Sequence, residues 1–203
     1  MHIPILTIGH SSHTIEAFIA LLKMHGVTAL ADVRSHPASK YFPHFSKNDL
    51  ANNLRSADIA YIFLGKELGA RSQNPLCYKN GKVQYDLLAE EALFQDGLNR
   101  IRQGAENHSI AMMCAEKDPL DCHRAILVSR QLHLSGFPIS HILADGSLEP
   151  HQDLEHRMLQ KYKIPILGDM FRSPSECLIE AYTIHGDKIA YEDEKMAETD
   201  GAE

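Results

Sequence analysis

Apolar residues form two kinds of run along this chain. Five short runs of strand length contain few polar positions, at residues 3–8, 27–33, 59–64, 110–114 and 138–143. Between these runs, apolar residues recur every three or four positions, as in Ile15, Phe18, Ile19 and Leu22. Short apolar runs predict buried strands, and helical spacing predicts amphipathic helices. We therefore expect strands and helices to alternate.

This alternation predicts the fold class. It is typical of a three-layer α/β/α sandwich with a mostly parallel, Rossmann-like sheet of about five strands. We expect the helices at residues 15–25, 46–57, 85–103, 119–135 and 151–162. A single domain is expected over residues 1–172. Residues 173–203 are expected to be an acidic C-terminal extension, disordered from about residue 191.

Polar loops follow the first, second and fourth strands. Parallel strands end at one edge of a sheet, where ligands collect, so we expect these loops to build one cleft. The long segment at residues 65–83 is a candidate lid or binding loop. The loop residues that offer chemistry are His10, Ser11, Asp32, Arg34, Ser39, Cys114, Glu116, Cys122, His123 and Arg124.

The loop after the fourth strand holds the candidate catalytic residues Cys114, Glu116 and His123. Cys114 is expected to be either a nucleophile, if His123 or Arg124 lowers its pKa, or a wall of the pocket. Glu116 is the better candidate acid or base, because Asp118 is expected to cap the helix that follows. The cysteine–arginine spacing of thiol-dependent phosphatases is absent.

A metal or redox role for the two cysteines of this loop is an alternative. On a regular helix, Cys122, His123 and Arg124 would point in directions about 100° apart, so they would not all face one ligand. Cys114, Cys122 and His123 could form a zinc set, but their spacing matches no familiar zinc motif. A Cys114–Cys122 pair also lacks the usual redox spacing. The sequence therefore requires no metal, and the cofactor is unknown.

Two other loops contain candidate binding residues, each with a structural alternative. His10 and Ser11 precede a helix, where they either bind an anion or form a turn and cap. Asp32 and Arg34 lie on one side of a strand end, where they either pair with each other or present the guanidinium to a phosphate or carboxylate. The remaining candidate substrate-binding residues are Ser39, Arg124 and His141.

Composition limits the classes of partner. The formal net charge is −7, and six acidic residues against two lysines between Lys188 and Glu203 supply −4 of it. The remaining body is close to neutral, so a nucleic-acid partner is not favoured. Four cysteines without a signal peptide indicate reduced thiols in the cytoplasm. No apolar run reaches transmembrane length, so we expect no membrane partner.

Several short blocks, taken together and in order, resemble one protein family. They are Thr7-Ile-Gly-His-Ser11, Asp32-Val-Arg34 with Pro37 and Ser39, Leu68-Gly69, Cys114-Ala-Glu116 with Pro119, Cys122-His-Arg124, and His141-Ile with Gly146 and Pro150-His151. Over residues 3–155 the chain is similar to the microbial family known as domain of unknown function 488. The resemblance implies a single α/β domain, a cleft built from these loops and stand-alone cytoplasmic proteins, but it implies no activity.

The leading hypothesis is an enzyme that acts on a small anionic or nucleotide-like substrate. Hydrolysis or group transfer is favoured over hydride transfer, because no dinucleotide-binding fingerprint follows any strand. One alternative is a non-catalytic module that binds a ligand or a nucleic acid. The other is a metal or thiol-redox protein that uses Cys114, Cys122 and His123. The oligomeric state is left open.

Overall fold

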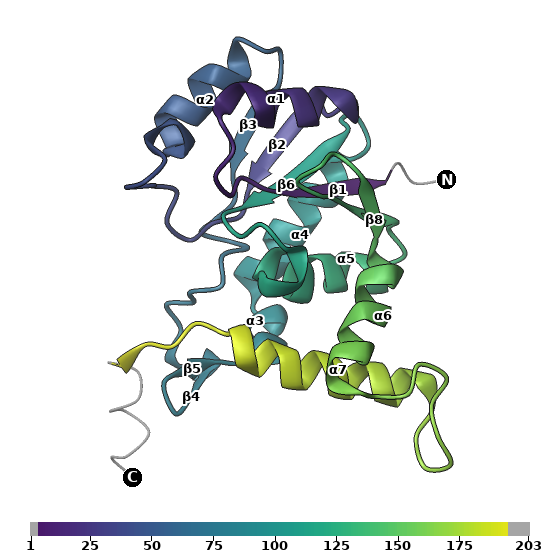
Figure 1. Cartoon of the computed structure of the whole chain (residues 1–203). Coiled ribbons are helices and arrows are strands. Elements are labelled where there is room, and N and C mark those ends of the chain that lie inside the picture. Colours follow the sequence, from purple (N-terminus) through teal and green to yellow (C-terminus); the bar gives the residue numbers. More distant parts are fainter. Residues whose placement is uncertain (1–3, 195–203) are drawn as a thin grey trace.

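A computed structural model of the chain, which describes residues 4–194, contains a six-stranded sheet with helices on both faces (Figure 1). The strand order is β3-β2-β6-β1-β7-β8, and only the edge strand β8 runs antiparallel to its neighbour. The strands are β1 Ile5–Gly9, β2 Ala29–Asp32, β3 Ala60–Phe63, β6 Ile110–Cys114, β7 Ile139–Ile142 and β8 Leu148–Pro150. The predicted α/β fold is confirmed.

The helices form a layer on each face of the sheet. Figure 1 shows α1 and α2 above the sheet and the other labelled helices below it. The helices are α1 Ile15–Met24, α2 Lys47–Arg55, α3 Tyr85–Glu90, α4 Ala92–Gly104, α5 Arg130–Leu134, α6 His151–Tyr162 and α7 Pro174–Ile189. No helix within residues 4–194 combines the length and the apolar character needed to cross a membrane.

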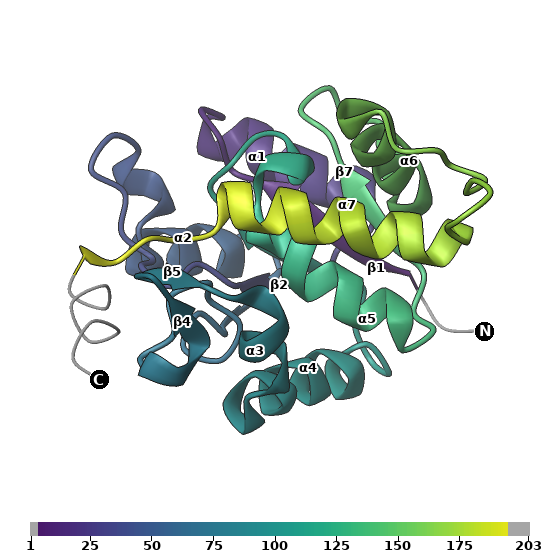
Figure 2. The same ribbon diagram turned by 90° about the horizontal axis from the view of Figure 1, so that it is seen from below.

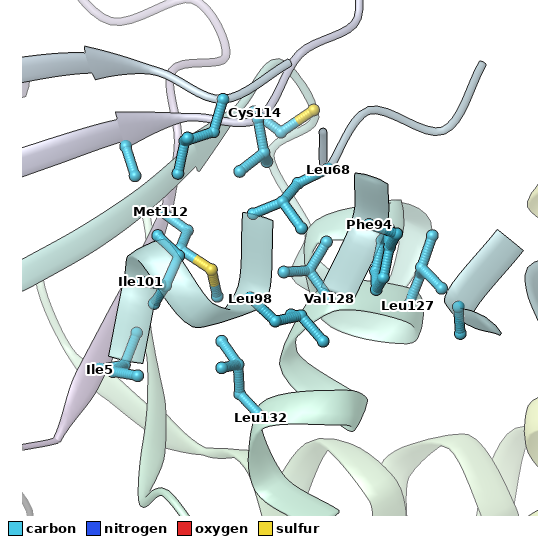
Figure 3. Close-up of a cluster of buried hydrophobic side chains, with 14 of the residues drawn as sticks. Ile5, Leu68, Phe94, Leu98, Ile101, Met112, Cys114, Leu127, Val128 and Leu132 are labelled. Carbon is cyan, nitrogen blue, oxygen red and sulfur yellow. The ribbon is translucent and has the colours of Figure 1, made fainter. Parts of the chain in front are cut away.

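Alternation along the strands divides the core into two layers. On β6, Ala111 and Met113 pack with the buried side chains of α1 and α2. Met112 and Cys114 point the other way, into the layer that contains α4 and α5. Figure 3 shows this second layer, with Cys114 at its edge. The last residue of β6 is thus held by core packing while its sulfur lies at the edge of the sheet.

A third buried cluster joins α7 to the rest of the protein. It contains side chains of α6, of α7 and of the segment after β6, among them Leu154, Ile126 and Tyr182. Figure 2 shows α7 lying across α5 and beside α6. The chain beyond residue 172 thus begins with a packed helix. Residues 195–203, which include most of the tail expected to be disordered, lie outside the described residues.

Two expected helices are interrupted. Residues 85–103 form α3 and α4, because Glu91 between them has an extended backbone. The single helix expected at residues 119–135 is three pieces: a 3₁₀ turn Pro119–Asp121, a π-helix Arg124–Ser129, and α5. Cys122, between the first two pieces, is extended, with φ −138° and ψ 137°. The side-chain directions of a regular helix therefore do not apply to Cys122.

The long segment between β3 and α3 is ordered. It contains the short hairpin of β4 Tyr78–Lys79 and β5 Lys82–Val83. Asn80 and Gly81 between these strands both have positive φ, as the tightest hairpin turns require. The end of the described chain pairs with the hairpin, where the Val83 N–H donates to the Tyr191 carbonyl at 3.0 Å. This pairing places Tyr191 close to the carboxyl edge of the sheet.

Candidate functional site

The candidate site lies where two neighbouring parallel strands end. β2 and β6 are adjacent, and the helices that follow them cover opposite faces of the sheet. Such a point is where open α/β sheets bind ligands. A cavity of about 270 Å³ opens there. The residues of the cavity wall that carry chemistry are Arg34, His36, Arg71, Tyr85, Cys114, Glu116, Asp121, Cys122, His123 and Tyr191.

His123 lies between the two cysteines at the buried end of this cavity. Its Nδ1 is 3.7 Å from Cys114 Sγ and 3.9 Å from Cys122 Sγ. Its Nε2 donates a hydrogen bond to the Val33 carbonyl at 3.1 Å. Because that bond fixes the proton of the neutral ring on Nε2, the lone pair of Nδ1 faces both sulfurs. The ring is therefore oriented toward the pair of thiols.

Glu116 and Cys122 are joined by a hydrogen bond in the same cluster. Cys122 Sγ and Glu116 Oε2 are 2.9 Å apart, and the Arg124 backbone N–H donates to Cys122 Sγ at 3.4 Å. Burial raises the pKa of Glu116, and the nearby Cys122 raises it further. Burial opposes ionisation of Cys122, but the Cys114 thiol, Arg124 and His123 together hold its pKa well below the usual value. The hydrogen bond to Cys122 and burial raise the pKa of Cys114.

Arg124 supports the loop after β6 from inside the protein. Its side chain is fully buried. Nη1 donates to the Glu116 carbonyl at 2.9 Å, and Nη2 donates to the Lys117 carbonyl at 3.3 Å. Nε has no hydrogen-bond partner among the described residues, and no carboxylate there forms an ion pair with this guanidinium. Its contacts hold the loop that carries Glu116, and Arg124 is absent from the cavity wall.

The strand-end pair of Asp32 and Arg34 forms a buried ion pair. Arg34 donates from Nε and Nη2 to the two carboxylate oxygens of Asp32, at 2.9 and 2.7 Å. Tyr61 donates a further hydrogen bond to Asp32, and Arg34 also donates to the Phe45 carbonyl. The structural alternative for this pair is therefore present. Arg34 nevertheless forms part of the cavity wall, held in a fixed orientation by its carboxylate partner.

Four other candidate binding residues lie away from the cavity wall. The backbone N–H groups of His10 and Ser11 are taken by the carbonyls of the loop after β6, and the His10 ring stacks on a phenylalanine at 4.4 Å. Ser39 Oγ accepts a hydrogen bond within its own loop. His141 is fully buried and hydrogen-bonds to Thr7 and His151. The structure thus unites Cys114, Glu116 and His123 with Cys122, and leaves these four outside.

Sequence reasoning missed five residues of the cavity wall that carry chemistry, which are His36, Arg71, Tyr85, Asp121 and Tyr191. Arg71 is exposed and lies over the ring of Tyr191, with 4.3 Å between the guanidinium carbon and the ring centroid. Tyr85 is the first residue of α3, and its side chain forms part of the cavity wall. Arg71 follows Leu68-Gly69, one of the blocks shared with the family, so its position was a usable signal. Nothing in the local sequence indicated that Tyr85 or Tyr191 would reach the site.

The fold and the site define a three-layer α/β protein with a Cys/Cys/His/Glu cluster at the carboxyl edge of its sheet. The family model described as domain of unknown function DUF488 matches residues 14–131, which is more than half of the chain, and the protein belongs to this family. The blocks around Cys114 and Cys122 fall inside the matched region, whereas the blocks at residues 7–11 and 141–151 lie outside it. No curated protein and no solved structure matches the chain significantly.

Proposed function

We propose that the protein is an enzyme, a hydrolase or group transferase, that acts on a small anionic substrate in the 270 Å³ cavity. One observation carries this proposal: a cluster of two buried thiols, an imidazole and a carboxylate shares a cavity with two guanidinium groups. The cluster supplies reacting groups, the exposed guanidinium of Arg71 supplies charge for an anion, and Arg34 forms part of the wall within its ion pair with Asp32. Glu116 is the acid or base, because its carboxyl group belongs to both the cluster and the cavity wall.

The size of the cavity limits the substrate. Pockets for drug-sized ligands usually enclose roughly 300–1,000 Å³, so this cavity suits a compact phosphate or carboxylate compound and not a dinucleotide. Arg71 is exposed, whereas the Cys114 and Cys122 thiols are buried, so an anion held by Arg71 would direct the rest of the molecule inward. A small molecule also suits a chain of net charge −7 better than a nucleic acid does. As part of the proposal we place the protein in the cytoplasm, where its four free thiols would stay reduced.

The first experiment measures thermal stability against a panel of phosphate esters, carboxylates and nucleotides at constant ionic strength. A ligand at a hundredfold excess over its dissociation constant should stabilise the protein by about 2.7 kcal/mol. Arg71→Met should abolish that shift because it removes the charge at the cavity mouth. Arg55→Met is the matched control, since Arg55 is also exposed but lies on α2, in the opposite layer.

Turnover is then measured with the compound that binds. Glu116→Gln should lower kcat by about 10²-fold or more and leave the thermal shift nearly unchanged, because general acid–base catalysis is worth about that much. Absence of binding by any compound of the panel would contradict the proposed substrate class. Binding without turnover would instead favour a non-catalytic module.

A further inference from the structure

We propose that Cys114, Cys122 and His123 bind one divalent metal ion of the zinc class through two sulfurs and Nδ1, with the fourth position open to the cavity. The inference concerns the proposed active site and rests on the proposed function for the role of that open position. The binding geometry itself is independent of any substrate. Among the described residues, these three form the group whose ligand atoms all lie within 4.8 Å of one another.

The two sulfur-to-nitrogen separations fit a tetrahedral centre. With Zn–S bonds of about 2.3 Å and a Zn–N bond of about 2.05 Å, tetrahedral angles give S···N separations of about 3.6 Å. The structure has 3.7 Å from Cys114 Sγ to His123 Nδ1 and 3.9 Å from Cys122 Sγ to the same nitrogen. Closing both distances to the tetrahedral value needs shifts of a few tenths of an ångström. Side-chain adjustment is enough for that.

The surroundings of the ligands match those of metal sites. A metal-binding histidine usually donates its other ring N–H to a carbonyl or carboxylate, which fixes the tautomer, and His123 donates Nε2–H to the Val33 carbonyl. The thiol sulfur of Cys122 also receives the backbone N–H of Arg124. A backbone donor of this kind stabilises a thiolate and fixes the position of the sulfur. Both contacts orient ligand atoms toward one point.

The charges balance when the ion binds. Each cysteine binds as a thiolate and releases its proton to solvent, so a divalent ion with Cys114, Cys122 and neutral His123 forms a centre of net charge zero. The buried guanidinium of Arg124, which has no carboxylate partner among the described residues, then balances an ionised Glu116, whose backbone carbonyl it contacts. Without an ion, two thiols that lie this close in the interior cannot both ionise without mutual repulsion.

Glu116 lies beside this centre and is not one of its ligands. Its carboxylate contacts Cys122 Sγ and forms part of the cavity wall, but it is absent from the mutually close set. Catalytic zinc sites keep three protein ligands and one open position, where a bound water reaches a pKa of about 7. A carboxylate beside such a water can take its proton. This division of roles, with Cys/Cys/His ligands and a separate glutamate, is used by zinc-dependent deaminases.

The experiment uses the full chain, purified under reducing conditions, and measures metal content by mass spectrometry and uptake of added Co²⁺ by absorption. We expect about one equivalent of metal per chain, and with Co²⁺ the visible bands of a tetrahedral site and a thiolate-to-cobalt band in the near ultraviolet. Cys114→Ser, Cys122→Ser and His123→Gln should each weaken binding by more than about tenfold. Glu116→Gln should retain the metal.

Cys177→Ala is the matched control. Cys177 is as fully buried as Cys122 but packs in the apolar cluster of α6 and α7. The variant should keep about one equivalent of metal, so loss of a buried thiol alone does not explain the effect. If a ligand variant fails to fold, the Co²⁺ spectrum of the unmodified protein still decides, because thiolate coordination has its own absorption.

Three results would overturn the proposal. They are no metal uptake by the reduced protein, uptake without a thiolate-to-cobalt band, and equal affinity in folded Cys122→Ser. The first result includes one special case. If protein isolated without reductant contains a Cys114–Cys122 disulfide and takes up no metal after reduction, the two cysteines are a redox pair.

The metal site and the proposed function can fail separately. If metal-free protein binds anions through Arg71, the proposed substrate class stands although the metal site is wrong. If the protein binds metal but no anion, the metal site stands and the proposed substrate class is wrong.

Discussion

His10 makes the stability of this protein depend on pH in a way that one substitution can isolate. The ring is 4% exposed, stacks on Phe45, and has Arg34, Asp32 and His44 as its charged or titratable neighbours. Burial, and then the positive charge of Arg34, lower the pKa of His10 from 6.5 to about 4. The folded protein therefore keeps this ring neutral in a pH range where the unfolded chain protonates it.

The size and sign of the effect follow from that difference. Between pH 6.5 and about pH 4 the unfolded state binds one more proton than the folded state, so the free energy of unfolding rises with pH in this window. A lowered pKa of His10 thus contributes stability that is complete above pH 6.5 and is lost as the pH falls toward 4. With about 1.4 kcal/mol per pKa unit, the total contribution of His10 is about 3 kcal/mol.

His10→Asn removes the titrating ring and keeps a donor for the Ser11 carbonyl, which His10 Nδ1 contacts at 3.0 Å. Chemical denaturation at several pH values from 4 to 8 should show a slope smaller by about 1.4 kcal/mol per pH unit below pH 6.5 than in the unmodified protein. The control is His36→Asn, because His36 makes the same contact with the Ser35 carbonyl at 3.0 Å but is exposed. Equal slopes in the unmodified protein and His10→Asn would refute the argument.

Three further substitutions test the packing around the site and elsewhere in the core. A Cβ at Gly9 would lie 1.9 Å from the Glu116 carbonyl oxygen, so Gly9→Ala should lower the free energy of unfolding by about 1–3 kcal/mol and weaken metal binding. A Cβ at Gly186 would lie 3.4 Å from its nearest neighbour, so Gly186→Ala should be neutral or raise the free energy of unfolding by about 0.5–1 kcal/mol. Urea unfolding and Co²⁺ titration measure both, and equal behaviour of the two variants would contradict the expectation. Tyr61→Phe removes the hydroxyl donor of the buried Asp32 and should cost about 1.5–3 kcal/mol in the same urea assay; a loss below about 0.5 kcal/mol would show that the contact contributes little.

The sheet could be predicted because its strands carry a strong local signal. The parallel strands at the centre are buried on both faces, so they are continuous apolar runs such as Ile110–Cys114. β8 was missed, since a three-residue edge strand that ends in a proline has no apolar run to detect. Helix starts were equally readable: Ser46 immediately precedes α2 as expected, although its side chain makes no capping hydrogen bond and accepts the Ser39 N–H instead.

Position at the sheet edge could be predicted for backbone loops, but side-chain direction could not. The loops after β1, β2 and β6 do meet, yet the chain turns His10 into a stack with Phe45 and Arg124 into the interior. Which loop residues face the cavity depends on contacts between segments far apart in the chain, such as that of His141 with Thr7. Local spacing carries no information about these contacts.

The clearest failure of sequence reasoning concerns the segment after β6, and its cause also explains the site. A regular helix from Pro119 would have separated Cys122 from His123 and kept one of them from Cys114. The buried guanidinium of Arg124 instead binds the carbonyls of the loop after β6, and Ser129 Oγ donates to the Arg124 carbonyl at 2.7 Å across the π-helix. These contacts move the helix start beyond Cys122, leave that residue extended, and turn its sulfur toward His123. Since π-helical turns are rare and often occur at functional sites, the distortion that hides the cluster from sequence reasoning is itself a structural indication of function.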